Sequence, residues 1–343
     1  MLTDRNMNLD STRLERQKRH LFRLKQKGVI RKTIYVHEDC APYLDRLKKH
    51  LISSESAPLL LNLTEKLERN KPVNVAQVKQ LSPFRYPGGK TWLVPEIRQI
   101  LRSLGKRPKI FIEPFAGGAI VGLTIAAENL ADKIILAELD IGVAAVWKTI
   151  LMNSERLCQR ILTFPINMET VISELSKKYK DINELAFQTL LRNRTQHGGI
   201  LAPGASLIKK GENGKGISSR WYPETLVRRI RIINILRQKI DFIEGDGFAI
   251  INKYFKKPNI FFYIDPPYTA GGKNSGKRLY AHNEINHKHL FDLMATVSGD
   301  FVMSYNDSKE VRELAGEHKF RIATIPMKNT HHEVMNELLI MKQ

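Results

Sequence analysis

Long apolar runs are missing from this sequence. No stretch of roughly eighteen consecutive apolar residues occurs, which argues against a transmembrane helix. The N-terminus is polar and basic, so we expect no secretory signal. No amphipathic stretch joins a large apolar face to flanking lysines, which disfavours a membrane surface as partner.

Cysteine is also scarce. The chain has two cysteines, Cys40 and Cys158, which are far apart and lack metal-ligand spacing. We therefore expect free thiols in a reducing cytoplasm and no disulfide framework. Residues 329–333, NTHHE, contain two histidines, but no third ligand cluster accompanies them, so we expect no metal.

Acidic residues are strongly outnumbered. Lys and Arg total 55 against 35 Asp and Glu, which gives a formal net charge of +20 and a pI near 9.9. Such an excess favours a polyanionic partner through counterion release. Residues 1–80 carry a net charge of +8 and residues 191–240 carry +9, so most of the excess lies in two segments. This pattern indicates a nearly neutral body with two basic attachments.

Apolar periodicity predicts strands that alternate with helices after residue 81. This alternation is typical of an α/β domain with a mostly parallel sheet. We predict strands at 109–113, 133–137, 240–243, 260–264, 301–304 and 337–341. We predict helices at 91–104, 119–129, 142–160, 168–192 and 223–238, with a Gly-rich basic segment at 195–219.

Two loops that follow predicted strands suit a nucleoside ligand. In the loop that begins at Glu113, EPFAGG, Gly117 and Gly118 let the backbone turn tightly and approach a ligand. Glu138 ends the next strand, where its carboxylate can accept hydrogen bonds from both ribose hydroxyls. The glycines do not form G-x-G-x-x-G, which disfavours a nicotinamide cofactor and fits S-adenosylmethionine. Each feature alone is also common as a plain glycine turn or an exposed Glu.

The third loop, Asp265-Pro266-Pro267-Tyr268, follows the buried strand pattern FFYI. Two prolines fix φ and remove two N–H donors, which leaves outward carbonyls without competing donors. A carboxylate and a carbonyl can together accept both hydrogens of an exocyclic amine, while Tyr268 stacks on the base. These four residues are our predicted catalytic set, and we expect positioning and preorganised dipoles to supply most of the acceleration.

The blocks FRYPGGK, FIEPFAGG, AELD, GDGF and DPPY occur in this order. Over about residues 82–343 the chain thereby resembles the Dam-type DNA adenine-N6 methyltransferases, the alpha group of amino-methyltransferases. The resemblance implies a Rossmann-like α/β fold with an inserted target-recognition domain. It implies methyl transfer from S-adenosylmethionine to a flipped-out adenine in duplex DNA. The predicted cofactor contacts are Tyr86, Gly88, Gly89, Lys90, Glu113, Phe115, Gly117, Gly118, Glu138, Asp246, Phe248 and Asp265.

Two departures from the family pattern concern the cofactor. The family often has Asp where this chain has Glu138, and F-x-G-x-G where this chain has FAGGA from Phe115. Both changes are chemically mild and affect the expected cofactor affinity more than the reaction.

The inserted basic region is similar to the family's recognition segment, and we expect a hairpin that enters a DNA groove. The loop 269–280 could close over the flipped base, although a plain flexible connection is as good an explanation. The predicted DNA contacts of these segments are Arg192, Asn193, Arg194, Gln196, His197, Lys209, Lys210, Lys215, Arg220, Lys273, Lys277 and Arg278. Residues 196–199, QHGG, differ from the pattern of GATC-methylating members, so the target sequence is left open.

Residues 1–80 lie outside the resemblance. A strand at 31–36 followed by helices at 39–51 and 58–69 fits a ribbon-helix-helix module, in which Arg31, Thr33 and Tyr35 would face bases and the chain would dimerise. A basic helical arm that grips phosphates is the alternative. The expected organisation is this extension at 1–80, a catalytic domain at 81–146 and 239–343, and a target-recognition domain at 147–238.

Two other functions stay open. One is methylation of RNA or of a protein glutamine, since both use related Pro-Pro-aromatic turns. The other is a DNA-binding regulator with a degenerate methyltransferase body, against which the intact Lys90, Glu138, Asp265 and Tyr268 argue.

Overall fold

The computed structural model divides into two compact units, residues 1–70 and 71–343. The structure describes residues 15, 18–26, 29, 44, 47, 78–85, 89–211, 214–267, 285–328 and 334–343. In the first unit residues 18–26 are helical, within the predicted helix 11–27, while the predicted strand 31–36 lies outside the described residues. The ribbon-helix-helix module and the homodimer therefore stay predictions. Among the described residues no helix is long and apolar enough to cross a bilayer.

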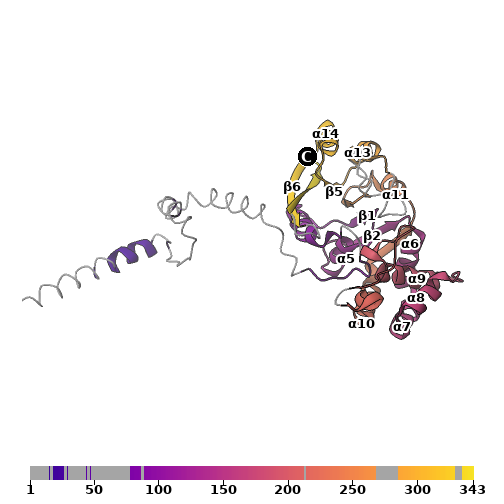
Figure 1. The fold of residues 1–343 in the computed structure, drawn as a ribbon. Coiled ribbons are helices and arrows are strands. Elements are labelled where there is room, and N and C mark those ends of the chain that lie inside the picture. The colour runs from indigo at the N-terminus through magenta and orange to yellow at the C-terminus, as the bar shows by residue number, and fades with distance from the viewer. Residues whose placement is uncertain are drawn as a thin grey trace, which may run out of the picture. The chain divides into compact units, whose positions relative to one another are not determined.

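The second unit is built on one seven-stranded sheet with the order β3-β2-β1-β4-β5-β7-β6 (Figure 1). The first five strands in this order pair in parallel, and β7 pairs antiparallel with both β5 and β6. The strands are β1 (Ile110–Glu113), β2 (Lys133–Glu138), β3 (Ile240–Glu244), β4 (Ile260–Ile264), β5 (Asp300–Asn306), β6 (Arg321–Lys328) and β7 (Val334–Met341). A doubly wound sheet of this kind is the Rossmann-like arrangement that the sequence predicts.

Helices cover both faces of the sheet because its central strands are apolar on both sides. In β1, Phe111 packs into one core cluster and Ile112 into the other, as expected when successive side chains point to opposite faces. Phe111 stacks on Phe261 of β4, with ring centroids 5.6 Å apart. The first cluster includes α4 (Val94–Ser103), α5 (Ile120–Ala127) and α6 (Ile141–Asn153). The second includes α11 (Gly247–Tyr254), α13 (His287–Ala295) and α14 (Lys309–Glu317).

Between β2 and β3 in the sequence, a group of helices extends the first core cluster. These are α7 (Glu155–Thr163), α8 (Met168–Ser176), α9 (Ile182–Thr195) and α10 (Pro223–Ile235), with the 3₁₀ turns η4 (His197–Gly199), η6 (Gly216–Arg220) and η7 (Leu236–Lys239). A further 3₁₀ turn, η3 (Lys90–Leu93), precedes α4. The group falls within the range expected for target recognition, and Figure 1 shows α7 to α10 gathered on one side of the sheet.

The predicted helices 142–160 and 168–192 are each two helices. The Asn153 side chain accepts the Glu155 N–H at 3.2 Å, which supports a break between α6 and α7. The Asp181 side chain accepts from the Glu184 N–H at 2.9 Å and starts α9 as an N-cap.

The Gly-rich basic segment differs from the expected hairpin. Its described residues form 3₁₀ turns and one isolated antiparallel bridge, Gln196 to Leu207. Gly199 has φ +74°, and a Cβ there would lie 2.3 Å from the Arg85 carbonyl oxygen. The close approach and the left-handed backbone at this point favour a tight turn over an extended strand.

Candidate active site

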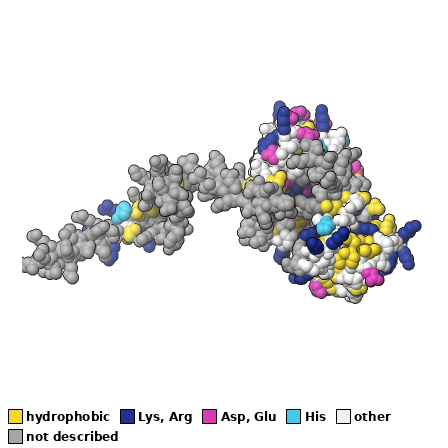
Figure 2. All heavy atoms as spheres, in the orientation of Figure 1, with side chains coloured by type: hydrophobic (Ala, Val, Ile, Leu, Met, Phe, Trp, Pro, Cys, Tyr) yellow, Lys and Arg dark blue, Asp and Glu magenta, His cyan; other side chains and the backbone are white. Residues whose placement is uncertain are grey.

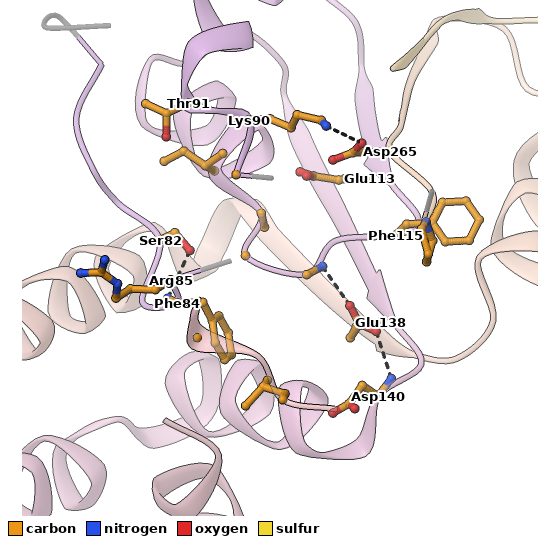
Figure 3. A pocket seen from close by; sticks show the side chains of 18 of the residues that line it. Ser82, Phe84, Arg85, Lys90, Thr91, Glu113, Phe115, Glu138, Asp140 and Asp265 are labelled. Carbon is orange, nitrogen blue, oxygen red and sulfur yellow. Dashed lines mark hydrogen bonds and ion pairs between the residues drawn. The ribbon is translucent and has the colours of Figure 1, made fainter. Parts of the chain in front are cut away.

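The strand order reverses between β1 and β4, which lie side by side in the sheet. Ligands of such sheets bind at this switch point, outside the carboxyl ends of the strands. A cavity of about 1140 Å³ lies there. Glu113, Glu138 and Asp265, which stand at the ends of β1, β2 and β4, all line it (Figure 3). The three loops that follow the predicted strands therefore meet at one cavity.

Backbone N–H groups hold Glu138 at the edge of the cavity. One carboxylate oxygen accepts from the Gly117 N–H at 2.9 Å, and the other accepts from Leu139 at 2.9 Å and Asp140 at 3.0 Å. Gly117 has φ +46°, and its carbonyl accepts from Trp147 Nε1 at 3.0 Å. Burial raises the pKa of Glu138, while these N–H groups oppose the rise.

Two aromatic rings form the wall beside Glu138. Phe115 and Phe248 meet edge to face with centroids 6.2 Å apart, and both line the cavity. Asp246 caps α11 by accepting from the Phe248 N–H at 3.2 Å. A Cβ at Gly247 would lie 2.6 Å from the Phe115 ring, so glycine is needed for α11 to approach this loop.

A buried polar cluster holds Asp265. The Lys90 ammonium lies 3.3 Å from Asp265 Oδ1 and 2.7 Å from Glu337 Oε1 of β7. The Ser304 hydroxyl of β5 donates to the same Asp265 oxygen at 2.9 Å, and the Tyr263 hydroxyl lies 3.2 Å from Ser304 Oγ. Burial raises the pKa of Tyr263 well above its ordinary value, which keeps the phenol neutral. Asp265 is therefore fixed from two sides while remaining on the cavity wall.

Glu113 lines the cavity but is almost fully buried, with 3% of its surface exposed. Its carboxylate accepts from the Gly122 N–H of α5 at 2.8 Å. Burial raises the pKa of Glu113 well above its ordinary value of 4.5, and the nearby negative charge of Asp265 adds to the rise.

A pH dependence of stability follows from Glu113. The pKa of Glu113 is raised in the folded protein, so the protonated side chain stabilises the fold. This stabilisation is fully present below about pH 4.5 and is lost as the pH rises through the raised pKa. We expect Glu113→Gln, which keeps an acceptor for Gly122, to remove this decline. Urea unfolding at about pH 5 and about pH 8 measures it, with the exposed Glu317→Gln as control. A wild-type decline retained in Glu113→Gln would contradict the assignment.

The other predicted cofactor and catalytic residues line this cavity or lie outside the described residues. Gly89, Lys90, Gly117, Gly118, Asp246, Pro266 and Pro267 line it. Tyr86, Gly88 and Tyr268 are not among the described residues. Lys90 has 5% of its surface exposed and contacts two carboxylates, a role that the Gly-Gly-Lys pattern does not reveal.

The predicted DNA contacts separate into surface and interior positions. His197, Lys209, Lys210 and Lys215 are exposed, and Arg192, Gln196 and Arg220 are half-buried. Asn193 differs from expectation because it is fully buried. Its amide bonds the backbone of Arg85 on both sides and the Gly199 carbonyl, so it joins two loops. Arg194 is also buried, on the cavity wall. Residues 31, 33, 35, 273, 277 and 278 lie outside the described residues.

Four residues that the sequence analysis did not single out belong to this site. Ser304 and Glu337 contact the Asp265–Lys90 pair, and Arg85 and Arg229 line the cavity. Ser304 and Glu337 stand within predicted strands, where an isolated polar residue carries no positional signal. In the parts of the chain that the structure describes, no three His, Cys, Asp or Glu side chains form a metal-binding group.

The solved structures to which this chain is similar have low sequence identities and low TM-scores. A candidate RNA methyltransferase from Pyrococcus horikoshii has 12% identity and a TM-score of 0.35, and the match covers 80% of this chain and 93% of that one. The magnesium protoporphyrin IX methyltransferase of Synechocystis has 9% identity and a TM-score of 0.30, and the match covers 73% of this chain and 78% of that one.

Sequence comparison gives the family. The Type II methyltransferase M.MjaIII of Methanocaldococcus jannaschii is 23% identical over 228 residues, which are 60% of this chain and 76% of that protein. The family model of the D12 class N6 adenine-specific DNA methyltransferases matches residues 86–196 and 214–330. These two segments make up more than half of the chain and contain all three loops of the cavity, so the chain belongs to the D12 class N6 adenine-specific DNA methyltransferases.

Proposed function

We propose that this cavity binds S-adenosylmethionine and the target adenine of duplex DNA together. Glu138 accepts hydrogen bonds from the ribose, and Asp265 accepts one from the exocyclic amine of the flipped adenine. The observation that carries the proposal is that both carboxylates line one cavity of about 1140 Å³. A small-molecule pocket typically has about 300–1,000 Å³, so this volume suits a cofactor and a base side by side.

The residues present fit the cofactor. A carboxylate suits two hydroxyls, and the neighbouring Phe115 and Phe248 offer an apolar wall for a purine ring. The bound cofactor would supply an electrophilic methyl group. Lys90 belongs to the support of Asp265 in this arrangement, because its ammonium contacts that carboxylate directly.

The chain's own contribution to the reaction is positioning. The adenine amine is a poor nucleophile because its lone pair is delocalised into the ring. Asp265 and the backbone carbonyl of Pro266 would accept its two hydrogens and favour a more tetrahedral nitrogen, whose lone pair then faces the methyl group. Lys90 and Ser304 fix the carboxylate before the base arrives, so little reorganisation is needed during the reaction.

The Dam-type subgroup is part of the proposal. The order of the five sequence blocks supports it, with the Gly-Gly-Lys loop ahead of β1 and the basic insertion ahead of β4. The family match leaves out residues 197–213, which fall in the Gly-rich segment, and we assign the choice of target sequence to this region.

A methyl-transfer assay tests the reaction and its substrate. The protein is incubated with plasmid DNA and labelled S-adenosylmethionine, and the DNA is digested to nucleosides. We expect label in N6-methyladenine, and sequencing of the product then gives the target sequence. Label in RNA or in protein alone would refute the proposed substrate. No label in any of them would favour a DNA-binding regulator.

The role of Glu138 has a separate test. We expect Glu138→Gln to weaken binding of S-adenosylmethionine about 10- to 100-fold, because hydrogen bonds to a charged group contribute about 1.5–3 kcal/mol. Calorimetry without DNA measures the dissociation constant. The control is Glu244→Gln at the end of β3, whose carboxylate pairs with Lys148 and does not line the cavity. An unchanged constant for Glu138→Gln would exclude the ribose assignment.

A further inference from the structure

Three arginines line the cavity at a distance from Asp265. Arg85 precedes η3, Arg194 lies on α9 and Arg229 lies on α10. In Figure 3, Arg85 is on the opposite side of the cavity from Phe115 and apart from the Lys90–Asp265 pair. Nothing in the proposed cofactor and adenine contacts uses these guanidinium groups.

The hydrogen bonds of Arg194 and Arg229 are incomplete. Arg194 Nη2 donates to the Pro83 carbonyl at 2.5 Å, and Arg229 Nη1 donates to the Ser82 carbonyl at 3.0 Å. The Nε atoms of both arginines are buried and have no hydrogen-bond partner among the described residues. Arg194 has only 5% of its surface exposed. Buried donors without an acceptor are costly, and both arginines line the cavity, where a ligand can accept from guanidinium donors other than the two that bind these carbonyls.

The charges around these arginines are of one sign. Burial lowers the pKa of Arg194 to about 9, and the positive charges of Arg229 and Arg85 contribute. Burial also lowers the pKa of Arg229, with Arg228 and Arg85 adding to the effect. No carboxylate of the described residues forms a salt bridge with Arg194 or Arg229, and no acidic group offsets either lowering. A buried positive charge without a counter-charge is destabilising, and an anion would compensate for it.

We propose that Arg194 and Arg229, with Arg85 beside them, form a binding site for a phosphodiester of the DNA strand whose adenine reaches Asp265. The inference rests on the proposed function, because it takes the target nucleotide to enter this cavity. Guanidinium groups match the oxygens of a phosphate with paired donors. The site fixes the backbone of the extruded strand and carries no sequence information.

A basic path leads to this site from the surface. Arg220 lines both the large cavity and a neighbouring pocket of about 510 Å³. Exposed His197, Lys209 and Lys210 line that second pocket. Figure 2 shows Lys and Arg side chains near a histidine on the visible face of the larger unit. A strand whose phosphates follow the second pocket therefore arrives at the arginines inside the cavity.

The test is the salt dependence of DNA binding in Arg229→Gln. Arg229 is half-buried and sits beside the exposed Arg228, so Arg228→Gln is the matched control. The probe is a fluorescein-labelled duplex that carries the sequence found in the methyl-transfer assay. We plot the logarithm of the association constant K for DNA against the logarithm of the salt concentration. For Arg229→Gln we expect this line to become less steep by about 1. The affinity ratio of wild type to variant then narrows about 4-fold between about 50 and 200 mM salt. Arg228→Gln should keep the wild-type slope, and thermal unfolding checks that both variants fold.

Other outcomes would overturn the proposal. An unchanged slope would mean that Arg229 only holds the Ser82 carbonyl. The carboxylate of S-adenosylmethionine is the other anion in the cavity, so its affinity is measured without DNA. Weaker cofactor binding with an unchanged slope would assign the site to that carboxylate. An equal loss of slope in Arg228→Gln would assign the effect to the surface of α10. A failed methyl-transfer assay would refute the proposed function earlier, before any salt titration.

Discussion

Replacing Asp265 by alanine is expected to lower the rate of methyl transfer to DNA by on the order of 10²–10³-fold or more, while S-adenosylmethionine still binds. The carboxylate stands at the end of β4 and is held by Lys90 and Ser304. In the proposed reaction it accepts a hydrogen of the adenine amine, so its loss removes a preorganised acceptor that costs no reorganisation. Losses of this size follow removal of one such group from an active site.

The measurement combines single-turnover methyl transfer with calorimetry of cofactor binding. Asp265→Asn is the matched variant, since it keeps the shape and one acceptor but removes the charge. We expect it to lie between Asp265→Ala and wild type in rate. Asp300→Ala serves as control, because Asp300 is exposed at the start of β5 and does not line the cavity. Full single-turnover activity of Asp265→Ala would rule out the proposed mechanism.

The parallel part of the sheet was predictable because its strands are locally distinctive. Apolar runs such as Phe261 to Ile264 are buried on both faces and therefore nearly continuous. Polar residues that end or directly follow such strands, Glu138 and Asp265 among them, must meet at one edge of a parallel sheet. The three predicted loops therefore converge, whichever order the strands take.

The antiparallel edge was less predictable. β6 contains Pro326, which lowers its strand propensity, although an edge strand tolerates proline. Glu337 on the predicted strand 337–341 gave no sign of its role, because its partner Lys90 lies 247 residues earlier in the chain. An ion pair of this separation depends on the register between β5 and β7, which local patterns do not determine.

Local sequence also does not determine which arginine of α10 faces the cavity. Arg228 and Arg229 are neighbours with identical chemistry, yet the first is exposed and the second lines the cavity. Periodicity places Leu226, Val227 and Ile230 in the core of α10. The side of the helix that faces the cavity depends on how α10 packs against α6 and α7, and this packing is a long-range property.

Lys90 is expected to be a large contributor to stability as well as a support for Asp265. Its side chain is 6% exposed and contacts Glu337, which is 2% exposed, and Asp265, which is 23% exposed. Lys90→Met removes the cation that both carboxylates contact, and breaking a buried pair in this way costs about 3–5 kcal/mol. We expect the free energy of unfolding to fall by this amount in urea titrations at neutral pH, with methyl transfer strongly reduced.

A double-mutant cycle separates the pair from the packing of the lysine stem. Glu337→Gln in the Lys90→Met background removes the buried charge that lost its partner, so part of the stability should return. The expected coupling between the two positions is about 0.5–3 kcal/mol. Activity should remain low in the double variant, because Asp265 still lacks the ammonium that fixes it. If the two changes are additive in stability, Lys90 and Glu337 act independently. If the double variant also recovers methyl transfer, Lys90 does not position Asp265, and the support of the catalytic carboxylate must come from Ser304 on β5.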